Sequence, residues 1–197
     1  MSRKKQPKYK KIIDAAVVVI AEHGFDQAQI SKIAKQAGVA DGTIYLYFKN
    51  KEDLLISLFR EKMGQFIRHI ENEIADKETI EEKLFKMIEM HFRQLSADYR
   101  LAVVTQLELR QSNKGLRSKI GEVLKPYLVV IDDILEKGME QGVFDTDLDV
   151  RLARQMIFGT LDETVTNWVL NERKYDLTSL AGSVSHLLIH GLSRGGN

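Results

Sequence analysis

Hydrophobic positions along the chain repeat every three to four residues, which is the period of helices that bury one face. From Pro7 onward, Ile12, Ala16 and Ile20 form one such stripe, and Gly24 is expected to end this first helix in a left-handed conformation. Segments in which apolar and polar residues alternate one by one, which indicate strands, are scarce. The pattern therefore predicts an all-α protein.

The next helices are predicted to be short. An apolar face over residues 30–37 ends at Gly38, and a third helix is expected over residues 41–48, anchored by Ile44 and Phe48. Asn50 is then expected to cap a fourth helix. Two short helices joined by a turn that contains glycine define a helix-turn-helix unit, here roughly residues 29–48. We therefore predict a three-helix DNA-binding domain over residues 1–52.

Longer helices are predicted after about residue 76, where Thr79 and Glu82 have the spacing of a capping box. The last helix is expected to turn six apolar residues inward: Leu180, Ala181, Val184, Leu187, Leu188 and Leu192. Leu152 and Phe158 fall off the main stripe of the preceding helix, and Ile189 does so in the last one. Helices that are apolar on two sides need a second partner. The pattern predicts that residues 53–197 form a second domain, which pairs as a homodimer through four helices.

Charge is also distributed unevenly along the chain. Residues 1–62 hold 12 Lys or Arg and 7 Asp or Glu, a net charge of +5, whereas residues 63–197 hold 17 and 21, a net charge of −4. A basic N-terminal part suggests a polyanion partner such as double-stranded DNA, although a solvated tail is the plainer alternative. The chain has no Cys, no apolar run of membrane-spanning length and no apolar segment after its charged start, so we expect a cytoplasmic protein.

Residues 37–55, which read AGVADGTIYLYFKNKEDLL, closely resemble the signature of the TetR family of transcription regulators. The resemblance covers residues from about 8 to 60. It implies three DNA-binding helices and a linking fourth helix. It also implies that residues 53–197 form an effector-binding and dimerisation domain, which dimerises through the last two long helices. A dimer of this kind would read a palindromic operator with its recognition helices in the major groove.

By that resemblance, the family's DNA-contacting positions fall on Ser31, Lys32, Gly42, Thr43, Tyr45, Tyr47 and Lys51. The residues suit the role, because Gly42 allows close approach of the DNA backbone and the tyrosine hydroxyls can meet phosphates or base edges. The chain departs from the family at two helix starts. Gln29 replaces the usual Thr or Ser cap of the second helix, and Ala40 replaces the usual Ser before the recognition helix.

Residues 105–113 and 149–160 resemble the TetR-type regulators of fatty acid degradation, which repress β-oxidation genes and leave DNA when they bind long-chain acyl-CoA. Such an effector needs an apolar cavity for its acyl chain and cations for its phosphates. The candidate ligand-binding residues are His91, Phe92, Gln106, Arg110, Arg117, Arg151, Arg154 and Phe158. The alternative is that the apolar residues are core, the arginines are a solvated face and His91 is a hydrogen-bonded core histidine.

Two other functions are considered. A repressor of an efflux pump that senses drugs or other lipophilic compounds would share every DNA-binding feature. A helical enzyme acting on acyl thioesters is disfavoured, because the chain lacks a thiol nucleophile, a nucleophile elbow and a phosphate loop. His186 and His190 have a spacing that can hold a metal, but no third ligand is evident, so we predict neither a metal site nor a cofactor nor catalytic residues.

Overall fold

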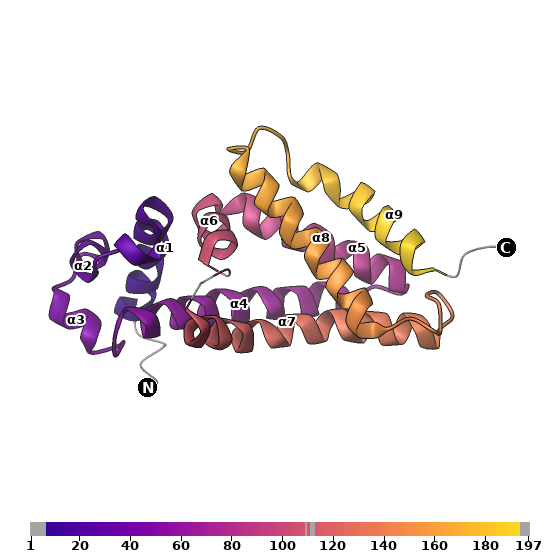
Figure 1. The fold of residues 1–197 in the computed structure, drawn as a ribbon, viewed down its shortest axis with the longest axis horizontal. Helices are drawn as coiled ribbons and strands as arrows, with labels where there is room; N and C mark the ends of the chain where they lie inside the picture. The colour runs from indigo at the N-terminus through magenta and orange to yellow at the C-terminus, as the bar shows by residue number, and fades with distance from the viewer. Residues whose placement is uncertain (1–6, 109, 111–112, 194–197) are drawn as a thin grey trace. The chain divides into compact units, whose positions relative to one another are not determined.

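The computed structural model describes residues 7–108, 110 and 113–193, and all regular structure in this part is helical (Figure 1). The all-α prediction is therefore confirmed. The elements are α1 (Pro7–Gln27), α2 (Ile30–Ala37), α3 (Asp41–Tyr45), α4 (Lys51–Ala75), α5 (Ile80–Ala97), α6 (Tyr99–Glu108), α7 (Lys114–Glu140), α8 (Val150–Leu170), the 3-10 turn η2 (Thr178–Leu180) and α9 (Ala181–Leu192). No helix in the described ranges is long and apolar enough to cross a membrane.

The first of two compact units comprises the described residues of Met1–Gly64 and Tyr99–Val123. Helix α1 is its centre and packs against both α2 and α6, with Ile12, Ala16 and Ile20 almost fully buried. The sequence predicts that α1 ends at Gly24, but the helix bends there, at a φ of 73°, and adds a further turn to Gln27. The Ala28 amide closes that turn by donating to the Gly24 carbonyl over 3.0 Å.

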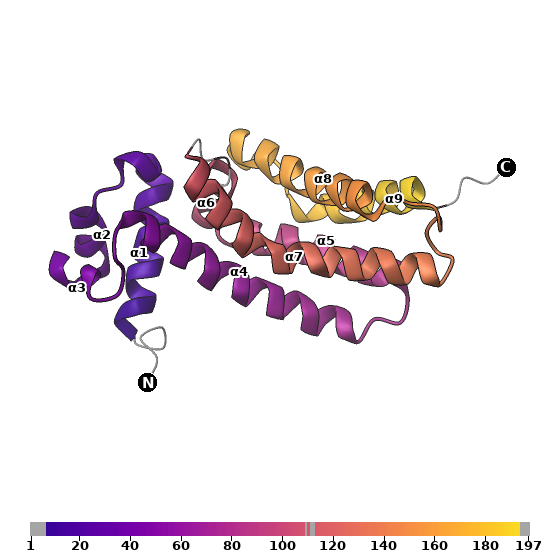
Figure 2. The same ribbon diagram turned by 60° about the horizontal axis from the view of Figure 1, so that its bottom comes forward.

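The second unit comprises Gln65–Asp98 and the described residues of Leu124–Asn197. Helix α5 packs against α8, η2 and α9 (Figure 2). Its start is fixed by the predicted capping box, which is confirmed. The Glu82 amide donates to the Thr79 hydroxyl over 3.2 Å, and the Thr79 amide donates to the Glu82 carboxylate over 3.1 Å. Helices α4 and α7 contribute residues to both units.

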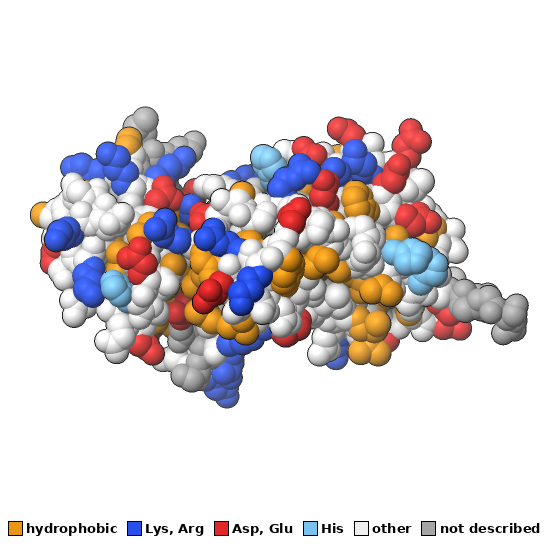
Figure 3. Space-filling view, turned by 90° about the horizontal axis from the view of Figure 1, so that it is seen from above, with side chains coloured by type: hydrophobic (Ala, Val, Ile, Leu, Met, Phe, Trp, Pro, Cys, Tyr) orange, Lys and Arg blue, Asp and Glu red, His pale blue; other side chains and the backbone are white. Residues whose placement is uncertain are grey.

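Helices α8 and α9 expose large apolar side chains. Leu152, Met156 and Leu187 are 57%, 46% and 71% exposed. The prediction that Leu187 points inward is wrong, because its neighbour Leu188 occupies the buried face and adjacent helical residues point about 100° apart. The space-filling view shows hydrophobic side chains gathered at the surface near histidine side chains (Figure 3). The C-terminal helices therefore present apolar area to solvent beyond what their own unit buries.

Candidate functional site

The helix-turn-helix is built by α2 and α3. Ile33, Ala34 and Ile44 are buried and hold the two helices on the core of the first unit. Between the helices, Gly38 adopts the left-handed conformation, at a φ of 67°, and the Val39 amide donates to the Ala34 carbonyl over 3.0 Å. A residue with a Cβ would be strained at this φ, so glycine sets the angle at which the chain leaves α2. The recognition helix is shorter than predicted, because it ends at Tyr45 and residues 46 and 47 follow as a turn.

Most of the predicted DNA-contacting residues lie on the outer surface of this unit. Tyr45 is 58% exposed, and the neighbouring Leu46 is 66% exposed. The others divide by accessibility: Ser31, Lys32 and Gly42 are exposed, whereas Thr43, Tyr47 and Lys51 are half-buried. Exposed hydroxyls, an ammonium group and bare backbone are the groups that contact phosphates and base edges. Their contact with DNA stays a prediction.

Tyr47 is fixed by aromatic neighbours. Its ring meets the buried Tyr9 ring edge-on, with centroids 6.2 Å apart at 61°, and lies 6.3 Å from the Phe48 ring. Tyr9 in turn stacks on Phe48 at 5.2 Å. This packing limits the positions that the Tyr47 side chain can adopt before DNA arrives, so less conformational entropy is lost when its hydroxyl meets a partner.

The helix starts follow the expected departures from the family. Gln29 and Ala40 precede α2 and α3, and neither makes a side-chain capping bond. At the start of α4, Asn50 accepts from the Asp53 amide over 2.8 Å, and the Asp53 carboxylate accepts from the Lys49 amide over 2.9 Å. The strong cap thus lies after the recognition helix, and fixes where α4 begins.

Lys51 contacts its own protein. Its Nζ donates to the carbonyl oxygens of Phe25 and Asp26, each over 2.9 Å, and lies 4.7 Å from the centre of the Phe25 ring. Carbonyls at a helix end carry partial negative charge, which an ammonium group stabilises. An ammonium has three donors, and these two bonds leave one for another acceptor.

Sequence reasoning missed Glu108. The carboxylate of this residue, the last of α6, is buried and accepts from the Phe25 amide over 2.9 Å. The partners are 83 positions apart, so no local pattern indicates the contact. The one available signal is an acidic residue on a helix whose neighbouring positions are mostly apolar. Glu108 and Lys51 therefore both attach to the short turn that follows Gly24.

In the second unit, His91 and Tyr127 form the centre of an aromatic cluster. The His91 Nδ1 and the Tyr127 hydroxyl are hydrogen-bonded over 2.9 Å, and Phe66, Phe92 and Phe158 surround them. Burial lowers the pKa of His91 from its ordinary 6.5 to about 4, and raises that of Tyr127 above its ordinary 10.0. Both groups are thus neutral near pH 7. The His91 Nε2 is buried and has no hydrogen-bond partner in the described chain.

Of the two predicted ligand arginines in this unit, Arg154 lies 2.6 Å from an Asp132 carboxylate oxygen, and Arg151 is exposed. The other Asp132 oxygen is buried and lacks a partner among the described residues. Gln106, Arg110 and Arg117 belong to the first unit. Gln106 is buried there, its carbonyl accepts from the Arg110 guanidinium over 2.8 Å, and Arg117 is exposed. The structure thus distributes the predicted ligand residues over both units, and their role in binding stays a prediction.

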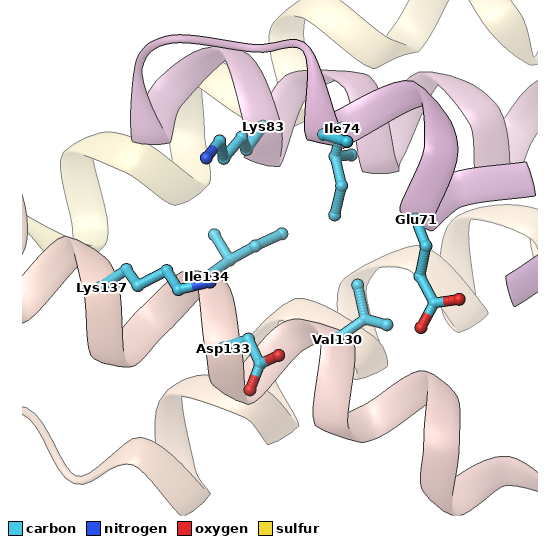
Figure 4. Close-up of a pocket in the computed structure, with 8 residues that line it drawn as sticks. Glu71, Ile74, Lys83, Val130, Asp133, Ile134 and Lys137 are labelled. Carbon is cyan, nitrogen blue, oxygen red and sulfur yellow. The ribbon is translucent and has the colours of Figure 1, made fainter. Parts of the chain in front are cut away.

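One cavity of about 220 Å³ lies between α4, α5 and α7 in the second unit (Figure 4). Lys83 and Lys137 approach it from one side and Glu71 from the other, and Ile74 of α4 and Ile134 of α7 point into it. Cavities that hold drug-sized ligands have about 300–1,000 Å³. This cavity is therefore too small for a whole acyl-CoA molecule.

No group of three or more potential metal ligands occurs in the part of the chain that the structure describes. His186 and His190 lie with their ring centroids 4.0 Å apart, and the His190 Nδ1 is 3.0 Å from the His186 carbonyl oxygen.

Comparisons with known proteins cover nearly the whole chain. Residues 12–58 match the family model described as bacterial regulatory proteins of the tetR family, and residues 59–191 match the C-terminal region of YsiA-like proteins. The fatty acid metabolism regulator protein of Bacillus subtilis (strain 168) is 64% identical over 190 residues, which cover 96% of this chain and 98% of that protein.

Solved structures agree with this match. FadR from Bacillus halodurans, a fatty acid degradation regulator, and FadR from Bacillus subtilis in complex with stearoyl-CoA each superpose with a TM-score of 0.91 at 64% identity. Each comparison covers 93% of this chain and 99% of the other. The ketosteroid regulator KstR2 of Mycobacterium tuberculosis shares the fold at 21% identity, with a TM-score of 0.72 over 97% of both chains. The chain thus belongs to the TetR family of bacterial transcription regulators, which are not enzymes.

Proposed function

We propose that this protein is a homodimeric repressor of fatty acid degradation genes that leaves its palindromic operator when it binds long-chain acyl-CoA. The observation that carries the proposal is 64% identity to the Bacillus subtilis fatty acid metabolism regulator over 96% of the chain. The solved relative that binds stearoyl-CoA has the same fold to a TM-score of 0.91, and its match includes the regulatory helices as well as the helix-turn-helix.

DNA binding is assigned to the exposed surface of α2 and α3. In this assignment Thr43 and Tyr45 of the recognition helix face the major groove, Tyr47 meets a phosphate, and Lys32 adds charge. The accessible positions of Tyr45 and Lys32 and the fixed ring of Tyr47 support this assignment. Dimerisation is assigned to the apolar surface that Leu152, Met156 and Leu187 expose on α8 and α9. Two recognition helices related by a two-fold axis require half-sites about 34–36 Å apart, or a multiple of this spacing.

The acyl chain is assigned to the interior around the His91 cluster. The aromatic rings there contact one another, with centroids 5.7–6.1 Å apart. Because protein interiors are close-packed, an acyl chain can enter only if these side chains and their helices shift. An effector changes DNA affinity only if it binds two conformations of the protein with different affinities. The shift of these side chains and helices distinguishes the two conformations.

The polar end of the effector is assigned to two kinds of group. The buried Nε2 of His91 lacks a partner in the described residues, and a thioester carbonyl would satisfy it in the tautomer that carries a proton on Nε2. The arginines 110, 117, 151 and 154 are assigned to the CoA phosphates, for which guanidinium geometry is suited. Asp132 holds Arg154 in place, which favours an orienting role for that residue.

The test is a fluorescence anisotropy titration with the palindromic DNA that the wild-type protein selects from a random library. Palmitoyl-CoA and stearoyl-CoA should displace the protein, whereas free CoA and acetyl-CoA should not, since each buried CH₂ contributes roughly 0.8 kcal/mol before ordering costs. Native mass spectrometry of the protein purified from bacteria should reveal retained acyl-CoA. Affinity that fails to rise with chain length, or displacement by drug-like compounds alone, would refute the acyl-CoA effector.

A further inference from the structure

Glu108 has a buried carboxylate that none of the assigned DNA or effector contacts uses. An ionised carboxylate is costly to bury unless hydrogen-bond donors compensate it. Here the Phe25 amide donates to it over 2.9 Å, and this bond joins α6 to the end of α1 within the first unit.

The turn that Glu108 contacts is also attached to α4. Lys51, the first residue of α4, donates to the carbonyls of Phe25 and Asp26, each over 2.9 Å, and lies over the Phe25 ring. Phe25 is thus bonded at its amide to a carboxylate and at its carbonyl to an ammonium. Hydrogen bonds to charged groups are roughly twice as strong as neutral ones. The turn is consequently held on one side by α6 and on the other by α4.

The turn connects the DNA-binding helices with the proposed effector contacts. After Ala28 the chain enters α2, the first helix of the helix-turn-helix. On the other side, Glu108 lies two residues from both Gln106 and Arg110, which are proposed effector contacts and are bonded to each other over 2.8 Å. A ligand bound by Gln106 and Arg110 would therefore displace the end of α6 where Glu108 lies.

We propose that Glu108 is a positioning residue that transmits effector binding from the end of α6 to the turn before α2, and so changes the orientation of the helix-turn-helix. This inference rests on the proposed function, because it takes long-chain acyl-CoA as the effector. When α6 moves, the hydrogen bond between the Glu108 carboxylate and the Phe25 amide breaks, whereas the bonds from Lys51 to the turn remain. The turn is then no longer held by both α6 and α4 in the orientation that binds the operator. The effector therefore favours one conformation of the protein over the other, which is what coupling between two binding sites requires.

The experiment measures a coupling ratio, defined as the operator Kd in saturating stearoyl-CoA divided by the operator Kd without it. The variants are Glu108→Gln, which keeps an acceptor oxygen, and Glu108→Ala, which removes it. Glu22→Ala is the matched control. Glu22 faces Arg100 at 3.7 Å across the same contact between α1 and α6, but both side chains are half exposed or more. Exposed pairs of this kind contribute little. Thermal unfolding of each variant without ligand reports its fold.

We expect Glu108→Ala to lower the coupling ratio at least fivefold, Glu108→Gln to lower it less, and Glu22→Ala to leave it unchanged. A merely structural role would lower the unfolding temperature and weaken operator binding equally with and without stearoyl-CoA, and this result would overturn the proposal. If Glu108→Ala fails to fold, Glu108→Gln alone decides, and an unchanged ratio in that variant overturns it.

A wild-type protein that ignores stearoyl-CoA would refute the proposed effector. Positioning by Glu108 is then judged from the operator Kd together with thermal unfolding. For this role to stand, Glu108→Ala must weaken binding at least fivefold relative to Glu22→Ala without lowering the unfolding temperature.

Discussion

Mild acid should destabilise this protein through His91. The pKa of the histidine is about 4 in the folded protein because the ring is buried, and it returns to about 6.5 when the chain unfolds. Between these two values the unfolded chain binds a proton that the folded protein does not, so stability is full above pH 6.5 and falls as the pH drops toward 4. The difference between the two pKa values lowers the free energy of unfolding by about 3 kcal/mol below pH 4. About 2.5 kcal/mol of this is already lost at about pH 4.5.

Urea unfolding at about pH 7 and about pH 4.5 measures this loss. The informative comparison is the double variant His91→Phe/Tyr127→Phe, which removes both partners of the 2.9 Å hydrogen bond while preserving most of the volume. Replacing both partners by apolar groups is often close to neutral, so its stability at pH 7 should be similar to the wild type. Its stability should fall about 2.5 kcal/mol less than that of the wild type between the two pH values.

Tyr127→Phe alone separates the hydrogen bond from the titration. It leaves the His91 Nδ1 buried without its partner, which should cost about 1–3 kcal/mol at pH 7. The imidazole remains, so the loss between pH 7 and pH 4.5 should remain as well. If the double variant loses as much stability on acidification as the wild type, other groups cause the pH dependence and our reasoning about His91 is wrong.

Three other predictions concern packing and DNA binding. Gly138→Ala should lower the free energy of unfolding in urea by about 1–3 kcal/mol, because the added Cβ would lie 2.2 Å from a Phe144 ring carbon. Gly121→Ala is the control on the same helix: its Cβ would meet nothing within 4 Å, so this change should be neutral or stabilising. Tyr47→Phe should weaken operator binding by about 1 kcal/mol, roughly fivefold in Kd, if the hydroxyl meets a phosphate; equal anisotropy titrations would exclude that contact. Deleting residues 1–5, which lie outside the described residues, removes three cationic side chains and should flatten the salt dependence of DNA binding; an unchanged slope would make them a solvated tail.

Local features of the chain predict most of the helical fold. The Thr79 and Glu82 capping box, the Asn50 cap and the helix end at Gly38 each depend on residues within a few positions, and all are present in the structure. The helix-turn-helix could be placed for the same reason. The end of the recognition helix was less predictable, because five residues form barely one turn and flanking contacts decide where it stops.

Contacts between distant segments were not predictable. From the sequence, Lys51 is expected to be a cation beside the recognition helix that is available to DNA. In the structure its ammonium donates to the carbonyl oxygens of Asp26 and Phe25, which lie 25 and 26 positions earlier in the chain. Glu108 carries a charged side chain, which the sequence alone would place at the surface, and only the packing of α6 on α1 shows that it is buried. Leu187 was misplaced because α9 is apolar on more than one side, so periodicity alone does not select the buried face.

The attachment of Phe25 to Glu108 limits how modular this protein can be. The family model for the DNA-binding region ends at residue 58, which suggests a natural point for recombining one reading domain with another regulator's sensor. A chimera joined there would leave Glu108 behind on α6, together with the surface that α1 covers. The recipient would have to supply a carboxylate and a matching helix, or the grafted domain would keep a buried amide without its acceptor. A working exchange should therefore carry residues 99–123 along with the first 64, because those two stretches form one compact unit.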